Sequence, residues 1–299
     1  MTTRRSESGF TLGELMVSVS LMLVLMGTVT TLLIRTAESH RTVWNRTEMH
    51  SAVRGATELL QQEVGQAGLV ALPGAVTLAG AVASGAQTVA VSSATGMFIG
   101  EKLVIGTGDA AETVSVTAIS GNDISAVFAS AHDAGAPVFA IGGFSSGIVP
   151  PSMANGSTGS VLKLYGDVNN DGRMVYVEYT CDTANMRLYR NVTGFAAMIK
   201  PPLASALVLL SNIVPNPNGT PCFSYQTAVV GGDTYVLDVA ITLTVQTQER
   251  DAVTQQFQLE TKTLLNVSPR NVFNVWELAS IGETNRLQPI PPSVLFLIQ

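Results

Sequence analysis

Residues 1–35 read MTTRRSESGFTLGELMVSVSLMLVLMGTVTTLLIR, and this stretch decides the fold. A short polar head carries Arg4 and Arg5, and an uncharged run of twenty residues extends from Leu15 to Ile34. At about 1.5 Å per residue, a helix of that length is about 30 Å long, which matches the hydrocarbon core of a bilayer. The two arginines favour a cytoplasmic N-terminal end, so everything after Ile34 is predicted to be exported.

The residues around the start of the run indicate how this segment is processed. A secretory signal would place a small-residue cleavage site after the run, but the residues from Arg35 onward continue a helical pattern. Before the run stands Gly9-Phe10-Thr11-Leu12-Gly13-Glu14-Leu15. This segment resembles the class III signal of type IV prepilins, except at Gly13, where family members usually carry a bulky aliphatic residue. The resemblance implies cleavage between Gly9 and Phe10 and N-methylation of Phe10 by a prepilin peptidase. A plain signal anchor is the alternative.

Glu14 is an acidic residue at the start of the predicted membrane helix, where an unpaired carboxylate costs about 2–3 kcal/mol. Cleavage after Gly9 would create a cationic amine on Phe10, about one helical turn away. The resemblance implies that Glu14 pairs with such an amine, its own or that of a neighbouring subunit, and so acts in assembly. A carboxylate near a helix N-terminus is also favoured by the helix dipole. A charge at the membrane interface without any role is the alternative.

Composition limits the partners and the compartment. The chain has 299 residues, enough for two domains, and a formal net charge of −6. An acidic exported protein is not expected to bind nucleic acid in general. Two cysteines, Cys181 and Cys222, lie in the exported part and are expected to pair in an oxidising periplasm. Two free buried thiols are the alternative.

Beyond Arg35 the helix is predicted to continue to about Gly68, because apolar residues recur at three- and four-residue spacing from Met49 to Ala67. Residues 75–142 are rich in Ala, Gly, Val, Ser and Thr and carry short β-like runs between glycines, which predicts a small inserted β-rich unit. A long flexible loop is the alternative. Longer strands are predicted from about residue 160, and one of them, Tyr235–Thr247, alternates apolar and polar residues as an antiparallel strand with one wet face does.

The predicted fold class is therefore α+β, with one long N-terminal helix packed on an antiparallel sheet (143–272) and followed by a C-terminal tail (273–299). This order resembles minor pilins of the PilW kind and the J-type minor pseudopilins of type II secretion. Three segments carry the likeness: the helix end at 59–68, the central hairpin at 174–190 and the strand end at 268–271. The unit at 75–142 and the tail fall outside it.

Two motifs suggest chemistry. Gly143-Phe-Ser-Ser-Gly147 fits the G-x-S-x-G pattern of a nucleophile elbow, but Pro150 and Pro151 follow where a helix should start, so we interpret it as a linker. The spacing of Asp167, Asn169, Asp171, Gly172 and Glu178 fits a calcium loop. Strands are predicted on both sides, so an Asx-rich hairpin turn is the favoured interpretation and Ca²⁺ binding the alternative.

These features favour a structural protein over an enzyme. The resemblance implies a minor pilin that is held in the inner membrane and then packed, through its N-terminal helix, against other pilins near the tip of a type IV pilus, where it helps to start assembly. A minor pseudopilin of a type II secretion system and an adhesive module at a pilus tip are the alternatives. No cofactor is expected apart from the possible Ca²⁺.

Overall fold

A computed structural model describes residue 9, residues 11–252 and residues 254–299 of the chain. The first element, α1 (Leu12–Gln66), is a single helix of 55 residues. Every side chain from residue 11 to residue 41 is exposed, including the whole uncharged run from Leu15 to Ile34. A helix that is apolar all round and exposed all round is typical of a membrane span. α1 is long and apolar enough to cross a bilayer, so it could anchor the protein in a membrane.

By its internal contacts the chain divides into two units. The first contains the chain up to His50 together with Thr247–Gln258, and the second contains Ser51–Gln246 together with Leu259–Gln299. In the first unit, an exposed ion pair joins the Arg41 guanidinium to the Glu249 carboxylate at 3.1 Å. All the sheets and the clusters of buried apolar residues belong to the second unit.

The last part of α1 presents the predicted apolar stripe. The buried members share one helix face at three- and four-residue spacing: Val53, Ala56, Leu60, Val64 and Ala67. The helix ends at Gln66, two residues before the predicted end. Gly68 has a φ of +83°, a left-handed conformation that only glycine adopts readily and that commonly ends helices.

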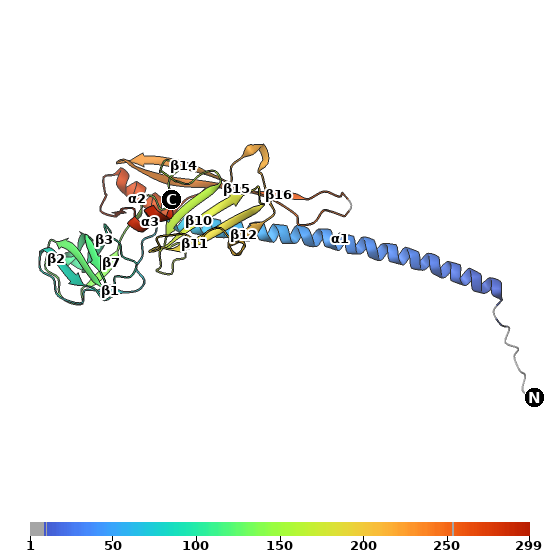
Figure 1. Cartoon of the computed structure of the whole chain (residues 1–299), viewed down its shortest axis with the longest axis horizontal. Helices are drawn as coiled ribbons and strands as arrows, with labels where there is room; N and C mark the ends of the chain where they lie inside the picture. The colour runs from blue at the N-terminus through green and yellow to red at the C-terminus, as the bar shows by residue number, and fades with distance from the viewer. Residues whose placement is uncertain (1–8, 10, 253) are drawn as a thin grey trace, which may run out of the picture. The chain divides into compact units, whose positions relative to one another are not determined.

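The region predicted as an inserted β-rich unit, 75–142, forms two small antiparallel sheets (Figure 1, teal to green). One has the order β1-β7-β3-β4 and the other β2-β6-β5. The β-like run from Thr113 to Ile119 forms parts of two strands, β4 and β5, which belong to different sheets. The bounds are β1 Val76–Thr77, β2 Gly85–Ala90, β3 Lys102–Ile105, β4 Glu112–Ser115, β5 Ala118–Ser120, β6 Asp123–Phe128 and β7 Pro137–Ala140.

The larger strands form two further antiparallel sheets, here called the main sheets. The first has the order β12-β11-β10-β9 and the second β13-β15-β14, with β16 also paired to β15. The bounds are β9 Val161–Gly166, β10 Val175–Asp182, β11 Arg187–Gly194, β12 Val208–Ser211, β13 Ile213–Val214, β14 Phe223–Val230, β15 Asp233–Gln246 and β16 Leu259–Val267. The α+β class is thus confirmed as a long apolar helix followed by antiparallel sheets.

The C-terminal segment corrects the predicted boundary. The division between residues 272 and 273 falls inside a helix, α2 (Arg270–Ser280), and a second helix, α3 (Pro292–Leu297), follows. Residues of both helices belong to the buried core, where α2 packs on β15 and on the short strand β8 (Gly143–Phe144). Strand β17 (Leu287–Gln288) pairs in parallel with β8. The segment after 272 is therefore part of the folded core, because its apolar side chains cover the main sheets.

Candidate functional site

The start of α1 places Glu14 in a reciprocal helix cap. The Glu14 carboxylate accepts the backbone N–H of Thr11 at 3.0 Å and its hydroxyl at 2.9 Å, and the Thr11 hydroxyl accepts the backbone N–H of Glu14 at 3.3 Å. Thr-x-x-Glu at this spacing is a capping box, which satisfies N–H groups that a helix start otherwise leaves unpaired. Glu14 therefore has a local partner in the isolated chain. The three-residue spacing of Thr11 and Glu14 is the signal in the sequence that could have predicted this cap.

The predicted cleavage site straddles the limit of the described chain. Gly9 is exposed and lies outside the helix, and a Cβ added to it would meet no atom within 4 Å. Phe10, the predicted site of N-methylation, lies outside the described residues. The cleavage prediction therefore stays a prediction.

A second acidic residue of α1, Glu63, joins the helix to the first main sheet. Its carboxylate is buried and accepts hydrogen bonds from the Arg190 guanidinium on β11 and from the Tyr179 hydroxyl on β10. Burial and the Glu63 charge raise the pKa of Tyr179, so its hydroxyl remains a donor. Glu63 lies between Leu60 and Val64 on the buried stripe. A fully paired buried carboxylate fixes the orientation of this helix face on the sheet, which apolar contacts alone would not do.

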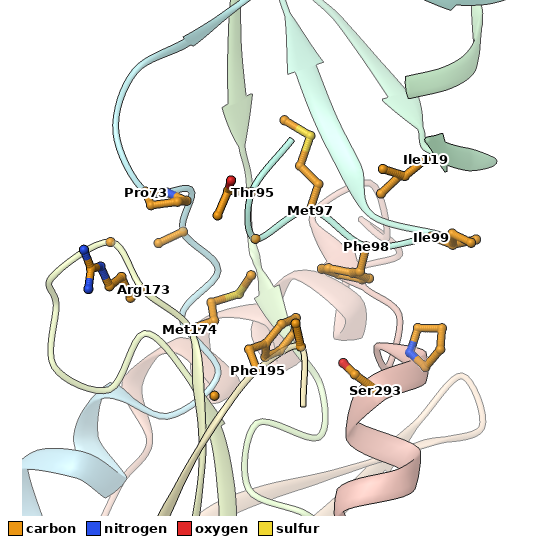
Figure 2. Close-up of a pocket in the computed structure, with 16 residues that line it drawn as sticks. Pro73, Thr95, Met97, Phe98, Ile99, Ile119, Arg173, Met174, Phe195 and Ser293 are labelled. Carbon is orange, nitrogen blue, oxygen red and sulfur yellow. The ribbon is translucent and has the colours of Figure 1, made fainter. Parts of the chain in front are cut away.

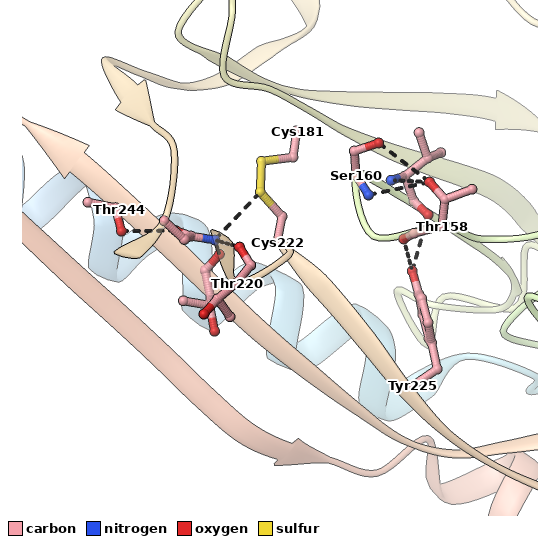
Figure 3. Close-up of a disulfide and its surroundings, with 10 residues drawn as sticks. Thr158, Ser160, Cys181, Thr220, Cys222, Tyr225 and Thr244 are labelled. Carbon is pink, nitrogen blue, oxygen red and sulfur yellow. Dashed lines mark hydrogen bonds between the residues drawn. A yellow bond between two sulfur atoms is a disulfide. The ribbon is translucent and has the colours of Figure 1, made fainter. Parts of the chain in front are cut away.

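The two cysteines form the predicted disulfide. Cys181 of β10 is bonded to Cys222, which directly precedes β14, so the bond joins the two main sheets (Figure 3). Nearby, the Tyr225 hydroxyl donates to the backbone carbonyls of Thr158 and Val161 at 3.0 and 3.1 Å. Covalent and polar links thus fix one main sheet against the other.

The loop that fits the calcium pattern is a compact turn. Both oxygens of the buried Asp167 carboxylate accept backbone N–H groups, from Asp171 at 3.0 Å and from Gly172 at 2.8 Å. Asn170 and Gly172 have φ values of 55° and 81°, the left-handed conformations that Asn and Gly favour in turns. The Asp171 carboxylate accepts the N–H of Arg173, and Asn169 is exposed. These contacts are those of an Asx-rich turn.

The twelfth residue of the pattern, Glu178, points to other partners. It lies on β10, and one of its carboxylate oxygens accepts the Tyr176 hydroxyl and the Lys200 ammonium, each at 2.8 Å. The buried Lys163 ammonium lies 3.9 Å from the same oxygen and donates to the Ile298 carbonyl at 2.8 Å, which ties the end of the chain to the sheet. Among the described residues, no group of three or more His, Cys, Asp or Glu side chains could hold a metal ion.

The G-x-S-x-G segment has a packing role. Ser145 and Ser146 are buried, and the Ser146 hydroxyl lies 2.5 Å from that of Tyr165. A Cβ on Gly147 would come within 2.3 Å of the Gly68 Cα, so glycine is required there by the close approach of two backbones. The segment connects β7 of the inserted unit to β9 of the first main sheet, and it is buried against the end of α1.

Neither a protein-family model nor a curated protein matches this chain.

Proposed function

We propose that this protein is a minor pilin of the PilW kind, a structural subunit that enters a type IV pilus through α1 and helps to start assembly near its tip. The observation that carries the proposal is the exposed, uncharged helix surface from Leu15 to Ile34. Glu14 directly precedes this surface, and Gly9 lies further toward the N-terminus. Such a surface is stable only in lipid or against similar helices. A pilin uses both surroundings in turn, first the inner membrane and then the packed helices of the filament.

The rest of the fold supports this role. A subunit held by one helix must transmit its position to the exported domain, and the buried Glu63 with Arg190 and Tyr179 provides a rigid attachment. The disulfide between Cys181 and Cys222 suits the oxidising periplasm through which the domain would pass. The proposed partners are other pilins, the inner membrane and a prepilin peptidase.

Processing is tested by Gly9→Val in the native host. We expect the variant to keep its leader, because the peptidase accepts only a small residue before the cut. Gly13→Ala is the matched control, since a Cβ there also meets nothing within 4 Å. Intact mass of membrane-extracted protein distinguishes the forms. An unchanged cut after residue 9 in Gly9→Val would contradict the leader assignment.

Assembly is tested at Glu14 with variants that separate its charge from its cap. Glu14→Ala removes both, Glu14→Gln keeps a capping residue but loses the charge, and Thr11→Ala removes the cap but keeps the charge. If Glu14 pairs with an N-terminal amine, both Glu14 variants are processed yet absent from sheared pili, whereas Thr11→Ala is present. Equal amounts of all three in pili would refute the pairing. If the wild-type protein is absent from pili, and a deletion strain no longer secretes exoproteins, the chain would instead be assigned to a type II secretion pseudopilus.

A further inference from the structure

A cavity of about 530 Å³ opens beside the inserted β-rich unit, within the second unit of the chain. Its walls come from six separate parts of the sequence: residues 71 and 73 after α1, the loop at 95–99, Ile119 of β5, residues 172–174 just before β10, residues 194–196 at the end of β11, and the start of α3. Figure 2 shows Met97 and Phe98 on one side facing Met174 and Phe195 on the other. The volume lies within the range of about 300–1,000 Å³ that is typical of sites for small organic ligands.

The walls are almost wholly apolar and adaptable. The Phe98 and Phe195 rings lie 5.8 Å apart in edge-to-face contact, and both side chains are largely buried, so together they form one apolar wall of the cavity. Two methionine side chains, Met97 and Met174, complete the walls, and methionine adjusts its shape to a bound group more easily than branched residues do. A planar or linear apolar body fits such walls.

One charged residue, whose side chain is exposed, lies at the edge of the cavity. Arg173 is the only ionisable residue among the described residues that line it, and it lies at one end, with Ser293 at the other (Figure 2). Within the described part of the chain, no carboxylate pairs with its guanidinium, although its backbone N–H is bound to Asp171. In a protein with a net charge of −6, an unpaired arginine at the mouth of an apolar cavity is complementary to an anionic head group.

We propose that this cavity binds a small amphipathic monoanion, an aryl or alkyl carboxylate whose apolar body lies against the wall formed by Phe98 and Phe195 and whose carboxylate pairs with Arg173. This site is separate from α1 and does not depend on the proposed pilin role.

The test uses the full chain in detergent micelles with ¹³C-labelled methionine methyl groups, titrated with 3-phenylpropanoate. The Met97 and Met174 signals, assigned by Met→Leu variants, are expected to shift saturably, with a Kd of about 0.1–1 mM for a ligand of this size. Met198, which does not line the cavity, should not move, and Met16 and Met22 on α1 report any partitioning of the ligand into the micelle.

Two variants and one analogue decide the outcome. Arg173→Gln should weaken binding at least about fivefold, as should replacing the acid by uncharged 3-phenylpropanamide, whereas the exposed Arg187→Gln should change nothing. Gly194→Phe should abolish the shifts, because a Cβ on Gly194 meets no atom within 4 Å and its side chain would fill the cavity. Absence of saturable shifts, or equal binding of the acid and the amide, would overturn the proposal.

Discussion

The main sheets and the inserted β-rich unit are both antiparallel, but they are held together differently. The main sheets contain the disulfide and buried charges with partners, such as Glu63 with Arg190 and Glu178 with Lys200. The inserted unit contains no cysteine and has an apolar core, a hydrogen bond between Glu112 and the buried His132, and the buried Glu101. Apolar contacts stabilise without direction, whereas paired charges fix orientation. The main sheets therefore hold most of these directional contacts, and one of them, between Glu63 and Arg190, joins α1 to a sheet.

The disulfide gives the largest expected difference between the two regions. Its cysteines are 41 residues apart, and closing such a loop stabilises a fold by about 4 kcal/mol in the loop-entropy account. We expect the double variant Cys181→Ser/Cys222→Ser to lose about that much free energy of unfolding in urea titrations. Hydrogen exchange should show the loss in β10 and β14 and not in β3 or β6. A uniform loss across both regions would contradict the comparison.

Arg190→Leu tests the attachment of α1. It leaves the Glu63 carboxylate buried without its cation, which we expect to cost about 3 kcal/mol in the same urea titration. The exposed pair of Arg54 with Glu58 on the same helix is the matched control, and Arg54→Ala should leave the midpoint unchanged. The double variant Glu63→Leu/Arg190→Leu should recover most of the loss, because no buried charge then remains. If it is no more stable than Arg190→Leu, the cost arises from packing.

Glu101 provides the next test, in the inserted unit. Its side chain is buried, one oxygen accepts the Phe98 N–H at 3.2 Å, and the other has no partner among the described residues. Burial raises the pKa of Glu101 to about 8. Because the folded state then binds the proton more tightly than the unfolded state, the free energy of unfolding falls as pH rises from about 5 to about 8, by at most about 1.4 kcal/mol per pH unit.

Glu101→Gln should remove this fall and be more stable than wild type by about 4 kcal/mol at pH 8. Glu112 is the contrasting carboxylate. Burial raises its pKa, but hydrogen bonds from the Ala129 and Ser130 N–H groups and from His132 outweigh burial and lower it overall. The stability that Glu112 contributes is therefore present above about pH 4.3, the ordinary glutamate pKa, and is lost only as pH falls below that value. If the free energy of unfolding changes with pH in the same way in wild type and in Glu101→Gln, the raised pKa of Glu101 is refuted.

Local patterns predicted some of these features and not others. The alternation along Tyr235–Thr247 identified β15, but the predicted wet face is absent in its second half, where residues 241–245 are all buried. From Glu112 to Ala118 the same alternation continues, yet the chain turns a corner near Val116. The N–H of Val116 donates to the Glu101 backbone carbonyl, whereas that of Thr117 donates to the Ser125 backbone carbonyl. A period of two residues indicates a strand but does not show which sheet it joins.

Among the candidate sites, too, some were predicted from local patterns and others were missed. The disulfide followed from an even count and the expected compartment, and the Asp167 turn followed from local residue types. Glu63 was missed as a contact, because its partners Tyr179 and Arg190 lie more than a hundred residues away in sequence. Helix α2 was missed although Val272, Val275 and Ala279 have helical spacing, since the boundary followed a resemblance and not that spacing.

The smallest expected effect concerns calcium at the Asp167 turn. A ligand that binds only the folded state adds about 2.7 kcal/mol at a hundredfold excess over its Kd, which would raise the melting temperature clearly. In this turn both Asp167 oxygens already accept backbone N–H groups, and Glu178 is paired with Lys200, so calcium would have to displace existing partners. We therefore expect the full chain in detergent to melt at the same temperature in millimolar calcium and in chelator. Asp167→Ala should melt lower in both buffers, because it leaves two turn N–H groups without an acceptor. A calcium-dependent rise in melting temperature that disappears in Asp171→Ala would instead make the loop a metal site. The main sheets would then contain bound metal in addition to the disulfide and the paired charges.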